Sequence, residues 1–198
     1  YLSTCAKNGF NVVQVQTICG VPCVNAYGQY SNISRQNPWD FSAIDRDDVY
    51  SYWNHMDYII EEAERNGIYI AMVCIWGGLV KGGAMDTEGA KAYGTFLAQR
   101  YKDHPNIIWV IGGDIQGNIK QDVWDTLART IKSIDKRHLM TFHPRGRHTS
   151  AKWWAQAEWI DFHTYQSGHR AYGQRMGNKD YPIPDNTEED CWMYVDST

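Results

Sequence analysis

Short apolar runs alternate with longer stretches of helical spacing along this chain, and this alternation constrains the fold more than any other feature. Five runs have the length and composition of strands: residues 10–17, 68–76, 106–114, 139–146 and 160–169. Four stretches between them have helical character: residues 47–65, 87–102, 123–134 and 150–159. An unbroken series of strands and helices predicts a parallel sheet with right-handed crossovers.

The side chains at the strand ends favour a barrel over an open sheet. An open doubly wound sheet concentrates its ligand groups at one switch point, whereas a (β/α)8 barrel takes them from nearly every strand. No G-x-G-x-x-G or Walker A loop supports a nucleotide-binding open sheet. Polar and aromatic residues close nearly every run: Gln14, Gln16, Trp76, Asp114, His143, Arg145, His163, Tyr165 and Gln166. We therefore predict an α/β fold of the (β/α)8 TIM-barrel class.

The length of the chain predicts only part of such a barrel. A complete (β/α)8 domain takes typically about 250 residues and eight strands, and this chain has 198 residues. We expect residues 1–198 to be a fragment of a single catalytic domain that lacks the first βα unit and the last two strands. Residues 25–45 form a long loop rich in Tyr, Asn, Gln and Ser, which we expect to line a substrate.

Composition excludes several classes of partner. No apolar run approaches the roughly 18 residues of a membrane helix, so no membrane span is expected. The net charge is −4 and no Lys/Arg cluster exceeds the short "HPRGRH", so no nucleic-acid partner is expected. Of the five cysteines, only Cys19 and Cys23 are close enough in sequence to suggest a loop disulfide. The odd number and unpatterned spacing of the cysteines leave the redox compartment open, and the sequence does not give the oligomeric state.

The run "IIWVIGGD", residues 107–114, ends a buried strand on a carboxylate. Gly112 and Gly113 leave room for a bulky ligand to approach the backbone, and Asp114 is held at the mouth of the pocket. A carboxylate placed there suits proton transfer, so Asp114 is the predicted general acid/base. The alternative is that Asp114 caps the next helix or pairs with Arg145.

Glycoside cleavage needs two carboxyl groups, about 5 to 9.5 Å apart depending on the stereochemistry. Asp114 is the one strong candidate. Asp161 begins its predicted strand, so we expect it at the opposite end of the barrel. The second acid is therefore expected after Thr198, and residues 1–198 alone are expected to be inactive.

Nine Trp and thirteen Tyr suit stacking on the apolar faces of sugar rings. Trp53, Trp109 and Trp124 occupy helix or strand core positions and are predicted to pack in the core. Trp76 and Tyr165 stand at strand ends, where stacking on a ligand and packing both stay open.

His143 and His163 occupy corresponding strand ends. Hydrogen-bonded pocket walls are one interpretation, and a metal site is another, because metal-dependent amidohydrolases place His on neighbouring barrel strands. We predict no metal or other cofactor, because the flanking strand offers Asp114 after glycines rather than a further His or Lys. A non-catalytic barrel that binds glycan through an aromatic cleft is a third possibility.

Four stretches resemble one known family: "GFNVVQVQ", "AERNGIYIAMVCIWGG", "YKDHPNIIWVIGGD" and "IDFHTYQSGH". Through them the chain resembles the apiosidase-like catalytic domain of bacterial glycoside hydrolases, close to glycoside hydrolase family 140. The resemblance implies a retaining glycosidase with Asp114 as acid/base and a Glu on the seventh strand, outside this chain, as its partner. It also implies a periplasmic or extracellular protein that attacks plant cell-wall glycan, with apiose-bearing pectin as substrate.

One departure from the wider pattern of barrel glycosidases concerns the end of the fourth strand. Those enzymes often carry Asn-Glu there, and this chain carries Gly113-Asp114. The pair argues against cellulase-type pyranoside specificity and is consistent with a furanose. The residues expected to bind the carbohydrate are Gln14, Gln16, Trp76, Gly113, His143, Arg145, His163, Tyr165 and Gln166.

Overall fold

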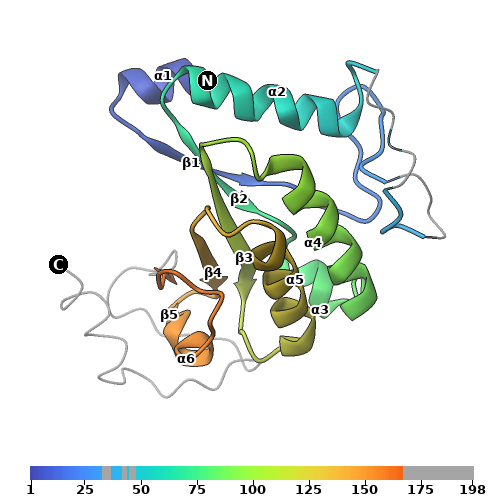
Figure 1. The fold of residues 1–198 in the computed structure, drawn as a ribbon, viewed down its shortest axis with the longest axis vertical. Helices are drawn as coiled ribbons and strands as arrows, with labels where there is room; N and C mark the ends of the chain where they lie inside the picture. Colours follow the sequence, from blue (N-terminus) through green and yellow to red (C-terminus); the bar gives the residue numbers. More distant parts are fainter. Residues whose placement is uncertain (33–36, 42–43, 45–47, 167–198) are drawn as a thin grey trace, which may run out of the picture.

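A computed structural model describes residues 1–32, 37–41, 44 and 48–166 of the chain. Its main sheet has four parallel strands in the order β1-β2-β3-β4, so each strand lies beside the next one in sequence (Figure 1). Their bounds are β1 (Val12–Gln16), β2 (Tyr69–Val73), β3 (Ile107–Ile115) and β4 (Met140–Pro144). The parallel βα series predicted from the sequence is confirmed over these four strands, as in part of a barrel.

The helices predicted over residues 47–65, 87–102 and 123–134 are present with changed bounds, and the short helix Gly77–Lys81 was not predicted. The helices that precede or join the four strands are α1 (Leu2–Lys7), α2 (Tyr52–Arg65), α3 (Gly77–Lys81), α4 (Thr87–Tyr101) and α5 (Gln121–Ile134). Helix α4 begins where Asp86 accepts a hydrogen bond from the Gly89 N–H at 2.8 Å. Within the described ranges, no helix combines the length and apolarity that crossing a bilayer requires.

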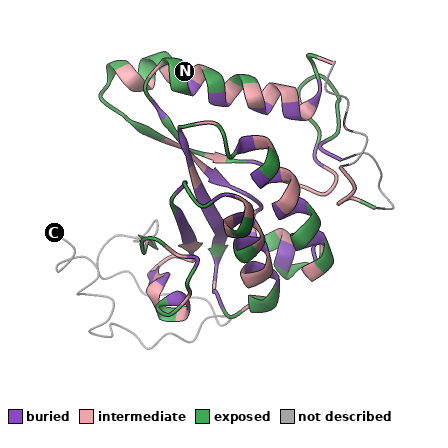
Figure 2. Cartoon of the chain, viewed as in Figure 1, coloured by how far each residue is buried: buried purple, intermediate pink, exposed green. Residues whose placement is uncertain are grey.

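One face of the sheet packs against the helices and forms the core. Side chains alternate along each strand, and Met72, Trp109 and Phe142 on this face are completely buried. Figure 2 shows the burial concentrated in the strands and on the sides of α4 and α5 that face them. Trp53 and Trp124 are also buried, so the prediction that these tryptophans pack in the core is confirmed.

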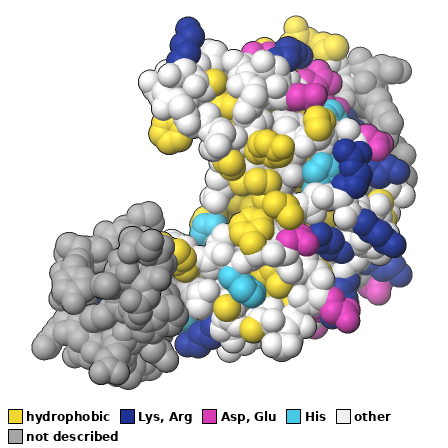
Figure 3. All heavy atoms as spheres, turned by 60° about the vertical axis from the view of Figure 1, so that its left-hand side comes forward, with side chains coloured by type: hydrophobic (Ala, Val, Ile, Leu, Met, Phe, Trp, Pro, Cys, Tyr) yellow, Lys and Arg dark blue, Asp and Glu magenta, His cyan; other side chains and the backbone are white. Residues whose placement is uncertain are grey.

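The opposite face of the sheet has no helix over it in the described part of the chain. The β1 side chains Val12, Gln14 and Gln16 are exposed on this face, and Tyr69 of β2 is 47% exposed. Figure 3 turns the side away from α4 and α5 toward the viewer and shows apolar side chains gathered across its middle. In a (β/α)8 barrel this face lines the interior, where side chains from several strands meet.

The fifth predicted strand, residues 160–169, is not a fifth parallel strand in the described part of the chain. The backbone follows the edge of β4, where the Asp161 N–H donates to the Met140 carbonyl at 2.9 Å. Next to it, the hydroxyls of Thr141 and Thr164 donate to the carbonyls of Phe162 and Phe142, so side chains replace ladder bonds.

A short antiparallel pair follows instead. It joins β5 (His148–Thr149) to β6 (Tyr165–Gln166), and residues 167–169 of the predicted strand lie outside the described residues. The helix predicted over residues 150–159 is only the single turn α6 (Ala151–Trp154). Cys19 and Cys23, the suggested disulfide pair, are free thiols with their Sγ atoms 3.2 Å apart.

A buried acid joins the amino-terminal parts of β3 and β4. The Asp135 Oδ2 accepts from Trp109 Nε1 at 2.8 Å and contacts His138 Nδ1 at 2.6 Å. Its Oδ1 accepts from the backbone N–H groups of Arg137 and His138. Burial acts to raise the pKa of Asp135, but these hydrogen bonds outweigh burial and hold the pKa below its ordinary value.

Candidate active site

Three consecutive residues just before the end of strand β3 have positive φ. The angles are +87° at Gly112, +134° at Gly113 and +52° at Asp114. Glycine adopts this region freely, and Asp is one of the few other residues that tolerate it. The pairing with β4 breaks between Gly112 and Ile115, so Gly113 and Asp114 form a β-bulge. The bulge leaves the Asp114 side chain exposed at the carboxyl edge of the sheet.

The bulge requires glycines because neighbouring groups occupy the space of a side chain. A Cβ on Gly112 would lie 2.8 Å from the His143 carbonyl oxygen, and one on Gly113 would lie 2.8 Å from Trp76 Cε3. A Cβ on Gly77 would lie 2.4 Å from the Gly113 carbonyl oxygen. The first turn of α3 therefore packs directly on the bulge. Gly77 was not among the predicted site residues, although the "WGG" after β2 was a signal for such close packing.

Two predicted site residues surround the bulge. Trp76 is the N-cap residue of α3, and its half-buried ring lies against Gly113. The imidazole of His143, at the end of β4, is 5.6 Å from the Trp76 ring, between centroids. The Asp114 N–H donates a hydrogen bond to His143 Nδ1 at 3.1 Å. The structure thus brings together four of the predicted residues, from three neighbouring strand ends.

The two predicted glutamines lie farther along the same face. Gln14 and Gln16 are exposed on β1, and the register aligns Gln16 with Val73 of β2 and, through it, with Val110 of β3. The Gln16 Nε2 donates to the carbonyl of Ile18 at 3.1 Å. They line the open face of the sheet two strands away from Asp114.

Four further predicted residues belong to the segments that follow β4. The Arg145 N–H donates to the Ile115 carbonyl at 3.0 Å. His163 is exposed, with its Nδ1 3.0 Å from Ser150 Oγ. Tyr165 and Gln166 form β6 and pair with β5. Arg145 therefore contacts the last residue of β3 through its backbone, whereas His163, Tyr165 and Gln166 contact residues 148–150 and form a second group.

Two alternatives from the sequence can be compared with this geometry. Helix α5 begins at Gln121 with Lys120 as its N-cap residue, so the alternative that Asp114 caps that helix is wrong. Among the residues that the structure describes, no three His, Cys, Asp or Glu side chains gather closely enough to hold a metal ion.

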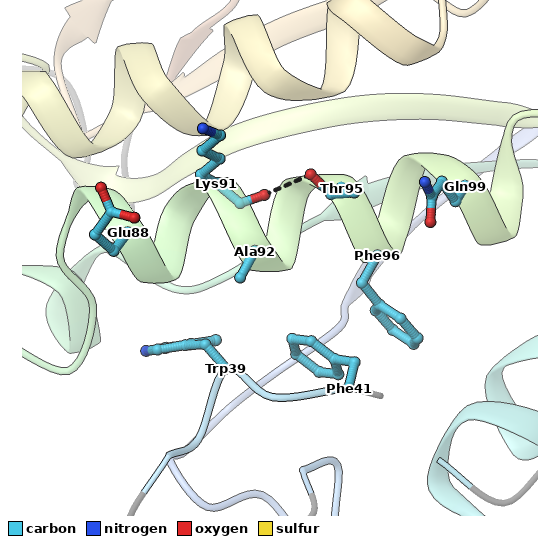
Figure 4. A pocket seen from close by; sticks show the side chains of 8 residues that line it. All are labelled: Trp39, Phe41, Glu88, Lys91, Ala92, Thr95, Phe96 and Gln99. Atoms are coloured by element: carbon cyan, nitrogen blue, oxygen red, sulfur yellow. Dashed lines mark hydrogen bonds between the residues drawn. The ribbon is translucent and has the colours of Figure 1, made fainter. Parts of the chain in front are cut away.

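Part of the loop predicted to line a substrate packs on the outside of α4. Phe41 stacks on Phe96 with ring centroids 4.3 Å apart and planes inclined by 11°. The Trp39 ring lies over Gly89, where a Cβ would be 2.5 Å from Trp39 Cδ1. Figure 4 shows these aromatic rings beneath the polar residues of α4, around a hollow on the helix side of the fold. This part of the loop therefore contacts a helix rather than the strand ends.

Comparisons with known proteins define the class of this chain. A solved glycoside hydrolase is 58% identical, with a TM-score of 0.90, and the match covers 100% of this chain and 44% of that one. A glycoside hydrolase family 5 protein from Bacteroides vulgatus is 59% identical, with a TM-score of 0.91, over 100% of this chain and 42% of its own. The chain spans less than half the length of these two relatives.

A more distant structure shares the fold alone. The endo-1,4-β-D-mannanase of Thermotoga petrophila is 17% identical, with a TM-score of 0.53, over 73% of this chain and 50% of its own. No curated protein matches the chain. The family model for the apiosidase-like catalytic domain matches residues 1–197. Within the glycoside hydrolases, the chain thus belongs to the apiosidase-like catalytic domain family, as the resemblance implied.

Proposed function

We propose that this chain supplies the acid/base part of a glycosidase active site, with Asp114 as the general acid/base. The observation that carries the proposal is the Gly112-Gly113-Asp114 bulge, which presents an exposed carboxylate beside Trp76 and His143. Carboxyl ends of parallel barrel strands are where catalytic groups of this fold class lie. Membership of a glycoside hydrolase family supports glycoside cleavage as the reaction.

In the proposed reaction Asp114 protonates the oxygen that leaves the sugar. A second carboxylate attacks the anomeric carbon, and Asp114 then takes a proton from the water that releases the sugar, so the configuration is retained. Asp114 is the only carboxylate on the four parallel strands β1 to β4. The partner acid would therefore come from elsewhere in the full-length protein, and the resemblance assigns it to a Glu on the seventh strand.

Asp161 has a different role, because it lies at the opposite end of β4. Its Oδ2 contacts the Lys132 ammonium at 2.6 Å and accepts a hydrogen bond from the Met140 N–H at 2.6 Å. Met140 is the first residue of β4, so this carboxylate holds the amino end of the strand. These contacts support a structural role for Asp161 rather than a catalytic one.

The proposed substrate is a plant cell-wall glycan of the pectic class that carries apiose. The half-buried Trp76 ring offers a surface for stacking on a sugar, and Gln14 and Gln16 offer amide hydrogen bonds along the same face. The shorter Gly113-Asp114 pair in place of Asn-Glu suits a furanose such as apiose. We place the protein in the periplasm or outside the cell, where such polymers are met.

The test is reducing-sugar release by the full-length protein on a panel of pectic and hemicellulosic glycans. Asp114→Asn should lower turnover by about 10²- to 10⁴-fold, because proton transfer to the leaving oxygen is lost. An aryl glycoside whose phenolate leaves without a proton should lose much less of its glycosylation rate. Asp103→Asn, an exposed acid in the turn before β3, is the matched control and should keep wild-type activity.

Two results would contradict the proposal. Near-wild-type turnover of Asp114→Asn on natural glycans would remove the acid/base assignment. Wild-type protein that binds glycan but releases no sugar from any member of the panel would instead point to the non-catalytic binding barrel.

A further inference from the structure

The amide of Asp114 lies outside the β3–β4 ladder, and a side chain supplies its partner. Because Asp114 is in the bulge, it faces no residue of β4. Its N–H instead donates to His143 Nδ1 at 3.1 Å. His143 is half-buried, and its ring is flanked by the Trp76 ring. The imidazole therefore ties the backbone of the exposed acid to the end of β4.

A second backbone group approaches the same ring nitrogen. The Pro144 carbonyl oxygen lies 3.0 Å from His143 Nδ1. A hydrogen on Nδ1 would form a hydrogen bond to that oxygen. The Asp114 amide would then face a second donor and would have no acceptor at Nδ1. A bare Nδ1 accepts from Asp114, and proteins leave carbonyl oxygens under-satisfied more readily than N–H groups. The contacts therefore favour the tautomer that carries its hydrogen on Nε2.

We propose that His143 is a positioning residue for Asp114, with a bare Nδ1 that accepts the Asp114 amide hydrogen. This proposal rests on the acid/base role of Asp114. A φ of +52° is sparsely populated for a residue other than glycine, and the hydrogen bond to His143 fixes the backbone of Asp114 in that conformation. Misplacement of a reacting group by about 1 Å can cost about 100-fold in rate. Loss of the bond should therefore lower kcat.

The sequence instead suggested a direct contact between His143 and the sugar, and two substitutions separate these roles. The side-chain oxygen of Asn can take the place of Nδ1, whereas the side chain of Gln reaches the place of Nε2. In the full-length protein, His143→Asn should keep kcat within about fivefold of wild type. His143→Gln should lower kcat about 10- to 100-fold and change KM less than about threefold. The unfolding temperature of each variant shows whether it is folded.

Three kinetic results would overturn the positioning role. If Gln preserves activity and Asn does not, the important atom is Nε2 and the contact is with the sugar. If both variants lose kcat equally, an acceptor at Nδ1 is not what Asp114 needs. If both retain kcat, the hydrogen bond is dispensable.

A spectroscopic measurement tests the same bond without any substrate. In full-length protein labelled with ¹⁵N-histidine, the ring nitrogens of His143 should show a bare Nδ1 and a protonated Nε2. A hydrogen on Nδ1 would overturn the proposal even in a fully active enzyme. If Asp114→Asn were active, the acid/base role and the positioning role would both fail, and the ¹⁵N measurement would still show independently whether Nδ1 is bare.

Discussion

Asp135 and Asp114 lie at opposite ends of the β3–β4 pair. Their side chains are chemically identical, but their surroundings differ. Asp135 is buried, and Trp109, His138 and two backbone N–H groups surround both of its carboxylate oxygens. Asp114 is exposed, follows two glycines and has a positive φ. The first carboxylate fastens the sheet to the turn before β4, and the second is the proposed general acid/base. In the proposed function, stability and chemistry are therefore separated along the same pair of strands.

The largest effect on stability is expected at Asp135. In Asp135→Asn, the amide NH₂ replaces an acceptor oxygen and faces donor groups in either orientation. Leaving such buried groups without an acceptor should lower the free energy of unfolding by about 2 to 3 kcal/mol. Chemical denaturation of the full-length protein measures this loss. A change below about 0.5 kcal/mol, the usual size for surface sites, would show that the buried acid does not hold β3 and β4 together.

A smaller loss of stability is expected when the bulge itself is altered. Gly113→Ala adds a Cβ 2.8 Å from Trp76 Cε3 and 3.1 Å from the Gly77 nitrogen, at a φ of +134°. Strain of this kind costs about 1 to 3 kcal/mol, and the displaced Asp114 should also lose activity. Gly78→Ala is the matched control, because its Cβ would make only an ordinary contact of 3.8 Å. Equal unfolding midpoints for the two variants would contradict the strained geometry of the bulge.

The contribution of Asp135 should also depend on pH. Its folded-state pKa lies below the ordinary value, so the unfolded chain takes up the proton first as the pH falls. The stabilisation is fully present above the ordinary carboxyl pKa, near 4, and is lost as the pH falls through the folded pKa. The difference in unfolding free energy between wild type and Asp135→Asn should therefore shrink in acid. A difference that stays constant from pH 7 to pH 3 would contradict the lowered pKa.

Local signals predicted some elements well and others poorly. Helix α4 was predicted at residues 87–102 and runs over Thr87–Tyr101, because its cap and its spacing are both local features. Helix α2 was predicted to begin at residue 47 and begins at Tyr52. Asp48 accepts a hydrogen bond from the Tyr50 N–H in a turn, and the Ser51 hydroxyl caps the helix instead. The prediction of a fifth parallel strand was wrong because the neighbours of this segment in space, and not its composition, decide its pairing.

The site could be predicted as a set of residues but not as a geometry. Parallel strands bring their carboxyl ends to one edge, so Trp76, Asp114 and His143 were predicted to lie together, and the structure places them together. The bulge could not be predicted, because it arises from a register shift between β3 and β4. The hydrogen bond from Asp114 to His143 depends on that shift, and so does the packing of Gly77 against Gly113.

The smallest effect on stability is expected at Asp114, from the same chemical change that is most damaging at Asp135. Asn tolerates positive φ as well as Asp does, and the side chain is exposed, so Asp114→Asn should change the free energy of unfolding by less than about 0.5 kcal/mol. Measured beside Asp135→Asn, it should give a folded protein with little activity, whereas Asp135→Asn gives a destabilised protein whose folded fraction stays active. If Asp114→Asn unfolds as readily as Asp135→Asn, the carboxylate at the bulge also supports the fold, and its loss of activity would no longer identify a catalytic group.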